Sequence, residues 1–250
     1  MRSAWERVRG TRGGIPPVIK PGLFQAMSVP AAADALRDHG YHPGFVLPPR
    51  SVDAILDFAH HTPCRLNDKE QGFIADVRNG RSPRGHAVAI ADVDTAHSCP
   101  AIEEVARDAT LVDITRSYFG YTPKRVIKRL FWSPASTLPD ETRRVGGQTI
   151  DFHYDIDAAS SLYFFFYITG ADACSGAHVV VPGTHKSKPL SILFSSCFQP
   201  DRRIAHLYPH ARPVVIEGPS GFGFVEDPAC FHKAFAPVDA DRLILQLRYS

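Results

Sequence analysis

Three side chains in the second half of the sequence have the types and the order of a metal-binding set. His153 and Asp155 lie two residues apart in the segment FHYDID (152–157), and His232 follows in ACFHKAF (229–235). If the first segment is a strand, alternate side chains share a face, so this imidazole and this carboxylate can bind one ion together. Two histidines and one carboxylate on one face of a metal leave its other positions open for exchangeable ligands.

A basic residue completes the pattern. Arg242 lies ten residues beyond His232, at the start of the last strand-like segment, and a planar guanidinium pairs bidentately with carboxylates. The set therefore indicates a non-haem Fe(II) centre that uses a dicarboxylate. Other interpretations remain open, because an isolated His-x-Asp pair arises by chance and His232 could be a hydrogen-bonded core histidine.

Longer segments carry a family resemblance. FHYDID, GAHVVVPGTHK, GFGFVEDPACFHKAF and RLILQLRY resemble the phytanoyl-CoA dioxygenase-like family of Fe(II)/2-oxoglutarate oxygenases, over about residues 120–250. The resemblance implies that His153, Asp155 and His232 bind Fe(II), and that Arg242 binds the distal carboxylate of 2-oxoglutarate. It also implies oxidation of a small-molecule substrate with O2, releasing succinate and CO2.

The sequence departs from the family at one position near this carboxylate. Many members carry a serine or threonine two residues after the distal histidine, where this chain has Ala234. Tyr163 is a candidate for the missing hydroxyl group, although it could equally be a packed tyrosine at the sheet edge. Arg129 alternates with apolar residues in a strand and would need an anionic or polar partner there. It could bind substrate or co-substrate, or reach the rim of the sheet instead.

Elements of two kinds must position these residues, and the sequence changes character near residue 121. Helical spacing dominates before it, and short β-type segments follow. The expected helices are 30–39 (ending at Gly40), the segment that follows Ser51 as N-cap, and 100–118, with 62–98 as loop and short elements. The expected strands are 125–132, 148–155, 161–169, 177–183, 212–218, 221–227, 229–235 and 242–249.

No helical segment long enough for a crossover lies between these strands, so alternating βαβ units are not expected. The fold class predicted is mainly β with flanking helices: a double-stranded β-helix (jelly roll, cupin-like barrel) with the N-terminal helices packed on one sheet. We expect a single domain over 1–250, with a mostly helical part at 1–120 and the jelly-roll core at 121–250.

Composition excludes several classes of partner. The formal net charge of +2 predicts no nucleic-acid partner, and no stretch is long and apolar enough to span a membrane. Five cysteines without CxxC spacing favour reduced thiols and a cytoplasmic protein.

The function predicted from these patterns is hydroxylation of a C–H bond. The alternative is a non-catalytic jelly-roll protein that binds a small ligand or glycan, with a vestigial metal site. A cupin-type isomerase or hydrolase is a further rival. The loop 133–147 and the segment 186–211 are expected to frame the pocket, and the sequence identifies neither the substrate nor the oligomeric state.

Overall fold

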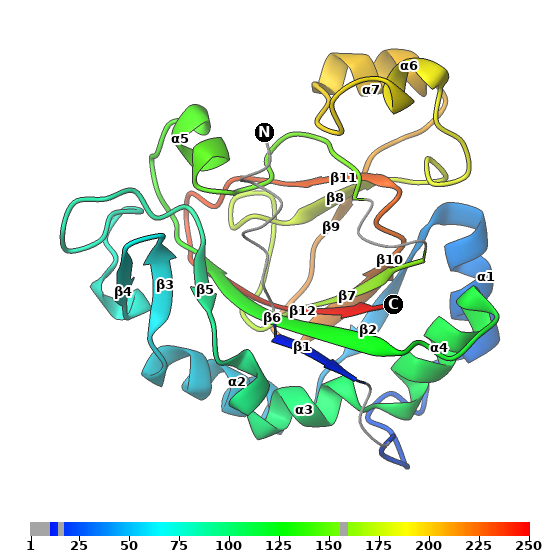
Figure 1. Ribbon diagram of the computed structural model, residues 1–250, viewed down its shortest axis with the longest axis horizontal. Coiled ribbons are helices and arrows are strands. Elements are labelled where there is room, and N and C mark those ends of the chain that lie inside the picture. Colours follow the sequence, from blue (N-terminus) through cyan, green and yellow to red (C-terminus); the bar gives the residue numbers. More distant parts are fainter. Residues whose placement is uncertain (1–10, 15–17, 156–159) are drawn as a thin grey trace.

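The computed structural model describes residues 11–14, 18–155 and 160–250. In these residues two antiparallel sheets face each other (Figure 1). The larger sheet has nine strands, in the order β2-β10-β7-β12-β6-β5-β3-β4 with β1 paired to β6, and the smaller sheet has the order β11-β8-β9. The expected jelly-roll architecture with flanking helices is confirmed.

The strands are short, and most lie in the second half of the chain. Their bounds are β1 Thr11–Gly14, β2 Tyr41–Val46, β3 Cys64–Asn67, β4 Glu70–Gly72, β5 Ala91–Val93, β6 Arg125–Ser133, β7 Leu162–Tyr167, β8 His178–Val181, β9 Val214–Ile216, β10 Phe222–Glu226, β11 Phe231–Ala234 and β12 Arg242–Tyr249.

The helices cover the outside of the sheets. Their bounds are α1 Val29–His39, α2 Pro49–His61, α3 Pro100–Ala106, α4 Ala109–Phe119, α5 Asp140–Val145, α6 Leu190–Leu193 and α7 Asp201–Leu207, with 3₁₀ turns at Ile74–Asp76 and Ala96–Ser98. Helices α1 to α4 lie on the outer side of the larger sheet, as predicted, whereas α6 and α7 lie beyond the smaller sheet (Figure 1). None of the described helices is long and apolar enough to cross a membrane.

Strand β7 shows how the sequence divides the core into two faces. All six of its residues are buried. Phe164 and Phe166 belong to the cluster that packs against the helices, whereas Tyr163, Phe165 and Tyr167 belong to the cluster between the two sheets. The alternation of side chains along a strand sends these two aromatic sets to opposite faces. The second set therefore faces the space between the two sheets.

The prediction of a strand over 148–155 is wrong. In place of a ladder, the structure has two isolated bridges, Phe152 with Gln199 and His153 with His232. Consecutive residues of this segment thus bond to different parts of the chain, one to the loop before α7 and the next to β11. A segment that follows no single partner cannot form a regular strand. The last two residues of FHYDID lie outside the described residues.

Two helix predictions also need correction. The second helix begins at Pro49 with Pro48 as N-cap, so Ser51 lies inside the helix and does not cap it. Proline suits the first helical turn because its missing N–H would have no partner there. The expected helix 100–118 is two helices, because the chain leaves the helical path at Asp108, which caps the second one.

Strands also occur in the part of the chain expected to be mostly helical. β2 pairs with β10, and β5 pairs with β6, so residues before 121 extend the larger sheet on both sides of its centre. The short elements expected within 62–98 are β3, β4, β5 and the two 3₁₀ turns.

Asp108 generates the first prediction, because its side chain joins two segments of the helical layer. Its carboxylate accepts hydrogen bonds from Thr110 N, Leu111 N and Leu23 N, and the residue is 1% exposed. We expect Asp108→Ala to lower the free energy of unfolding by about 1 to 2 kcal/mol, measured by urea denaturation.

A matched control lies in the same helix. Asp113→Ala removes only a partly exposed pair with Arg116 and should destabilise the protein much less. Equal losses in the two variants would contradict a capping role for Asp108.

Candidate metal centre

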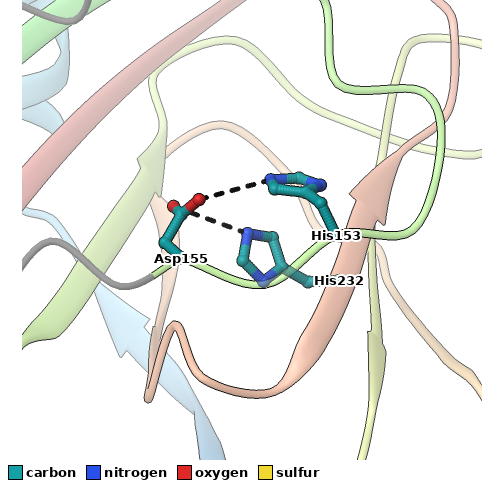
Figure 2. A group of neighbouring side chains, drawn as sticks. All are labelled: His153, Asp155 and His232. Atoms are coloured by element: carbon teal, nitrogen blue, oxygen red, sulfur yellow. Dashed lines mark ion pairs between the residues drawn. The ribbon is translucent and has the colours of Figure 1, made fainter. Parts of the chain in front are cut away.

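His153, Asp155 and His232 converge between the two sheets. Their ligand atoms all lie within 4.8 Å of one another. His153 Nε2 is 3.9 Å from Asp155 Oδ1, and His232 Nε2 is 4.0 Å from Asp155 Oδ2. Figure 2 shows the three side chains pointing toward a common point, with His232 on a strand and the other two on the segment beside it. The structure therefore brings together the three residues that the sequence singled out.

Backbone hydrogen bonds hold this arrangement. His153 N donates to His232 O at 2.9 Å, and His232 N donates to His153 O at 2.8 Å. Asp155 N donates to Pro228 O at 2.9 Å. The two histidines are thus a mutually bonded pair across a single bridge, and Asp155 is tied to the turn before β11. Side-chain alternation along a strand, the reason expected from the sequence, does not apply.

A hydrogen bond from Nδ1 determines which nitrogen of each imidazole is available to bind a metal. His153 Nδ1 lies 3.1 Å from Asp151 O, and His232 Nδ1 lies 3.0 Å from Cys230 O. A carbonyl only accepts, so each Nδ1 carries the proton and each Nε2 presents a lone pair to the common point. Burial also lowers the pKa of His232 to about 3, which keeps this imidazole neutral at neutral pH.

This donor set fits a divalent transition metal. Two neutral imidazole nitrogens and one carboxylate around a point are the ligands that non-haem Fe(II) sites use, and they leave further positions open. His153 and His232 are 5% and 4% exposed, so both imidazoles are already shielded from bulk water.

Arg242 lies in the same pocket, at 3% exposure. Its Nη2 donates to Ser133 Oγ at 3.0 Å and its Nη1 donates to Gly176 O, whereas its Nε has no hydrogen-bond partner among the described residues. Burial lowers the pKa of Arg242 to about 10, which still leaves it charged at neutral pH. A buried guanidinium with an unused donor is suited to an incoming anion.

The hydroxyl group beside Arg242 comes from a residue that the sequence did not single out. Ser133 is the register partner of Arg242 across β6 and β12, and its Oγ contacts the guanidinium. Tyr163 pairs instead with Arg248, six residues further along β12 and roughly 20 Å from Arg242 at the usual rise of a strand. Only the register of the strands brings Ser133 to this position, so no local pattern could have indicated it.

Arg129 lines the pocket. The anionic partner that such a position requires is Asp92, whose Oδ1 lies 2.7 Å from Arg129 Nε. The guanidinium also lies over the ring of Phe131, 4.1 Å from its centroid. Its role in binding substrate or co-substrate stays a prediction.

The pocket that contains these residues has a volume of about 530 Å³. Alternate side chains of β12 run along its wall, in the order Arg242, Ile244, Gln246 and Arg248. This wall therefore has a guanidinium at each end.

Both segments expected to frame the pocket contribute to its lining. The loop 133–147 supplies Arg144 and Gly147, and the segment 186–211 supplies Phe198. The ring of Phe198 stacks on His153, with 5.3 Å between the ring centroids. The second segment thus contacts one of the candidate ligands directly.

Two further polar residues lie beside the centre. His178 on β8 stacks against His232 with 5.3 Å between the ring centroids, and its Nε2 lies 2.8 Å from Glu226 Oε2. Burial raises the pKa of Glu226 to about 7 and lowers that of His178 to about 3. The sequence analysis assigned a role to neither residue. The signal that could have found Glu226 is a single acidic residue at the end of an otherwise apolar strand.

The comparisons with known proteins place this geometry in a known fold. No family model matches the chain, and no curated protein sequence matches it either. Among solved structures, the non-haem alpha-ketoglutarate-dependent epimerase SnoN from nogalamycin biosynthesis is 18% identical, with a TM-score of 0.61, over 88% of this chain and 82% of that chain. EctD from S. alaskensis, solved with 2-oxoglutarate and 5-hydroxyectoine, is 18% identical, with a TM-score of 0.63, over 98% and 85%.

A third similar structure is the non-haem alpha-ketoglutarate-dependent carbocyclase SnoK from nogalamycin biosynthesis. It is 15% identical, with a TM-score of 0.61, over 94% of this chain and 86% of that chain. The chain has the fold of these enzymes. The finer assignment to the phytanoyl-CoA dioxygenase-like family stays a prediction, because none of these three structures is described as a member of that family.

The geometry of the three side chains predicts metal binding that depends on each of them. We expect His153→Ala to weaken binding of Mn²⁺, titrated as an air-stable probe of the Fe(II) site, by at least about tenfold, because it removes one of three ligands. His61→Ala, which changes an exposed histidine at the end of α2, should bind Mn²⁺ as the unaltered protein does. Unchanged affinity in the His153 variant would exclude this residue as a ligand.

Proposed function

We propose that the protein is an Fe(II)- and 2-oxoglutarate-dependent dioxygenase that hydroxylates a C–H bond of a small molecule. The observation that carries the proposal is that one pocket holds two sites of different chemistry. His153, Asp155 and His232 offer a metal-ligand set with open positions, and Arg242 offers a buried cationic donor in the same pocket. A dicarboxylate that chelates a metal with one end and pairs with a guanidinium at the other satisfies both sites.

The similar structures support the choice of metal and co-substrate. SnoN was solved with Fe³⁺ and alpha-ketoglutarate, and EctD was solved with bound Fe and with 2-oxoglutarate. The present chain shares their fold, and its donor residues are of the types that such a metal and such a co-substrate require.

The three converging side chains hold the metal in this proposal. Nδ1 of His153 and Nδ1 of His232 each keep their proton and donate it in a hydrogen bond to a backbone carbonyl, so both Nε2 atoms stay free to bind, and Asp155 supplies the anionic ligand. The iron and 2-oxoglutarate, when bound, supply the oxidation chemistry, in which substrate, O2 and 2-oxoglutarate give hydroxylated substrate, succinate and CO2.

Two residues on the neighbouring strands β12 and β6 hold the far end of the co-substrate. Arg242 binds the distal carboxylate of 2-oxoglutarate, and Ser133 Oγ supplies the hydroxyl group that Ala234 lacks. Both side chains are buried, at 3% and 0% exposure, so water competes little for this carboxylate.

Hydroxylation is the reaction we propose, although the fold also serves other outcomes, since SnoN is an epimerase and SnoK a carbocyclase. The outcome depends on which bond of the substrate the pocket places near the metal. Halogenation is not proposed, because Asp155 occupies the position that a halide would need.

The pocket wall favours a substrate with anionic or other hydrogen-bond-accepting groups. Arg129 and Arg248 line the pocket along with Arg242, and Arg248 lies over the ring of Tyr163 at 4.6 Å from its centroid. Guanidinium groups on aromatic faces offer planar donors to carboxylates and phosphates. We therefore assign Arg129 and Tyr163 to the substrate end of the pocket in this proposal.

The alternative is a binding protein whose metal site has lost its function. The unsatisfied Nε of Arg242 and the two oriented imidazoles argue against it, because a folded chain gains nothing from keeping them buried without ligands. Anaerobic addition of Fe(II) and 2-oxoglutarate distinguishes the two. The dioxygenase should give a weak visible charge-transfer band, and aeration with substrate candidates should release succinate. Absence of both would favour the binding protein.

Arg242 generates a prediction of its own. Arg242→Ala should weaken 2-oxoglutarate binding by about 30-fold or more, because truncating one partner of a buried charge pair costs at least about 2 kcal/mol. The measurement is a titration of the charge-transfer band at saturating Fe(II), with Mn²⁺ affinity measured in parallel to show that the metal site is intact. Arg242→Lys keeps the charge but lacks the planar guanidinium. Its affinity for 2-oxoglutarate should lie between those of the unaltered protein and Arg242→Ala.

The control for this variant is Arg37→Ala, which changes a solvent-accessible arginine of α1 that does not line the pocket. It should leave 2-oxoglutarate binding unchanged. If the Arg242 variants bind 2-oxoglutarate as the unaltered protein does, the guanidinium has a structural role only.

A further inference from the structure

A buried acidic residue lies beside the candidate metal centre. Glu226, on β10, is 0% exposed. Its Oε2 pairs with His178 Nε2 at 2.8 Å, which leaves Oε1 without a hydrogen-bond partner among the described residues. His232 Nε2 lies 3.9 Å from this oxygen. The same nitrogen presents its lone pair to the point where the three candidate ligands converge.

Packing gives no reason for a carboxylate here. The ring of His178 lies near Phe165 and Phe224, with ring centroids 5.2 and 5.0 Å away, so the surroundings are aromatic. A carboxylate in such surroundings with one oxygen unsatisfied costs folding free energy, and an apolar pair of the same size would not. A cation bound next to His232 would offset that cost, because opposite charges attract strongly where water is excluded.

Glu226 is not itself one of the converging ligands. The group of side chains whose ligand atoms lie within 4.8 Å of one another consists, among the described residues, of His153, Asp155 and His232. Glu226 instead lies next to one of these ligands, His232. His178 both donates to its carboxylate and stacks on the His232 ring at an interplanar angle of 18°.

We propose that Glu226, held by His178, is a positioning residue of the metal centre. Its carboxylate adds a second buried negative charge, besides that of Asp155, for a divalent cation, and the pair fixes the His232 ring in its ligating orientation. The inference rests on the metal site of the proposed function. Residues of this kind outside the ligand set typically change metal affinity by about 10- to 100-fold when they are substituted.

The test is Glu226→Gln, which keeps the size of the side chain and removes its charge. We expect Mn²⁺ to bind about 10- to 100-fold more weakly than to the unaltered protein. We also expect the metal-free variant to be at least as stable to heat, because a buried carboxylate with an unsatisfied oxygen has been removed. A purely structural role gives the opposite result: lower stability of the metal-free form and unchanged Mn²⁺ affinity.

Two further variants keep the test decisive if Glu226→Gln folds poorly. His178→Phe removes the donor that orients Glu226 while keeping an aromatic ring, and should also weaken Mn²⁺ binding. Glu226→Asp keeps the charge on a shorter side chain and should restore part of the affinity. The matched control is Glu70→Gln, since Glu70 is also buried and hydrogen-bonded, to Ser82 and His86, but lies in β4. It should leave Mn²⁺ affinity unchanged.

The outcomes separate this inference from the proposed function. If the unaltered protein binds Mn²⁺ and Fe(II) with 2-oxoglutarate but folded Glu226 and His178 variants bind Mn²⁺ within about twofold of it, only the role of Glu226 is overturned. If the unaltered protein binds no metal, both proposals are overturned.

Discussion

The site depends on one pair of mutual backbone hydrogen bonds, between His153 and His232. His153 belongs to a segment with no regular strand structure, and this bridge fixes its position against β11. Because β11 is itself paired to β8 in the smaller sheet, the bridge transmits the rigidity of that sheet to a segment that would otherwise be a loop. The bridge therefore sets the backbone positions of both histidines, and the N–H of Asp155 is bonded separately, to Pro228 O.

The interior around this bridge contains polar atoms whose hydrogen bonds are not all satisfied. Arg242 Nε and Glu226 Oε1 are both buried and both lack a hydrogen-bond partner among the described residues. One is a cationic donor and the other an anionic acceptor, and they lie on different strands of the larger sheet. Such groups lower the stability of the empty protein, but they need no reorganisation when charged ligands arrive. The aromatic faces of β7 and the helical layer supply the burial that offsets this cost.

The sequence predicted the fold class and the residues of the triad, because strands of alternating character and a few chemically distinctive residues are local signals. It predicted the wrong reason for the proximity of the triad, since the backbone partners of 148–155 come from separate parts of the chain. Ser133 could not be predicted to contact Arg242, because that contact depends on the register between β6 and β12. The break at Asp108 was missed because the apolar spacing continues across it while a single side chain caps the next turn.

The position of β12 has a consequence for how the chain reaches this structure. This strand lies at the centre of the larger sheet, between β6 and β7, yet it comprises residues 242–249. Its partners on β6 precede it by more than a hundred positions, as Ser133 precedes Arg242. Pairings so distant along the chain form slowly, because a long loop must close before they stabilise anything. During synthesis, the edges of β6 and β7 that pair with β12 therefore stay unpaired until β12 has left the ribosome. In that interval these edges can pair with other chains.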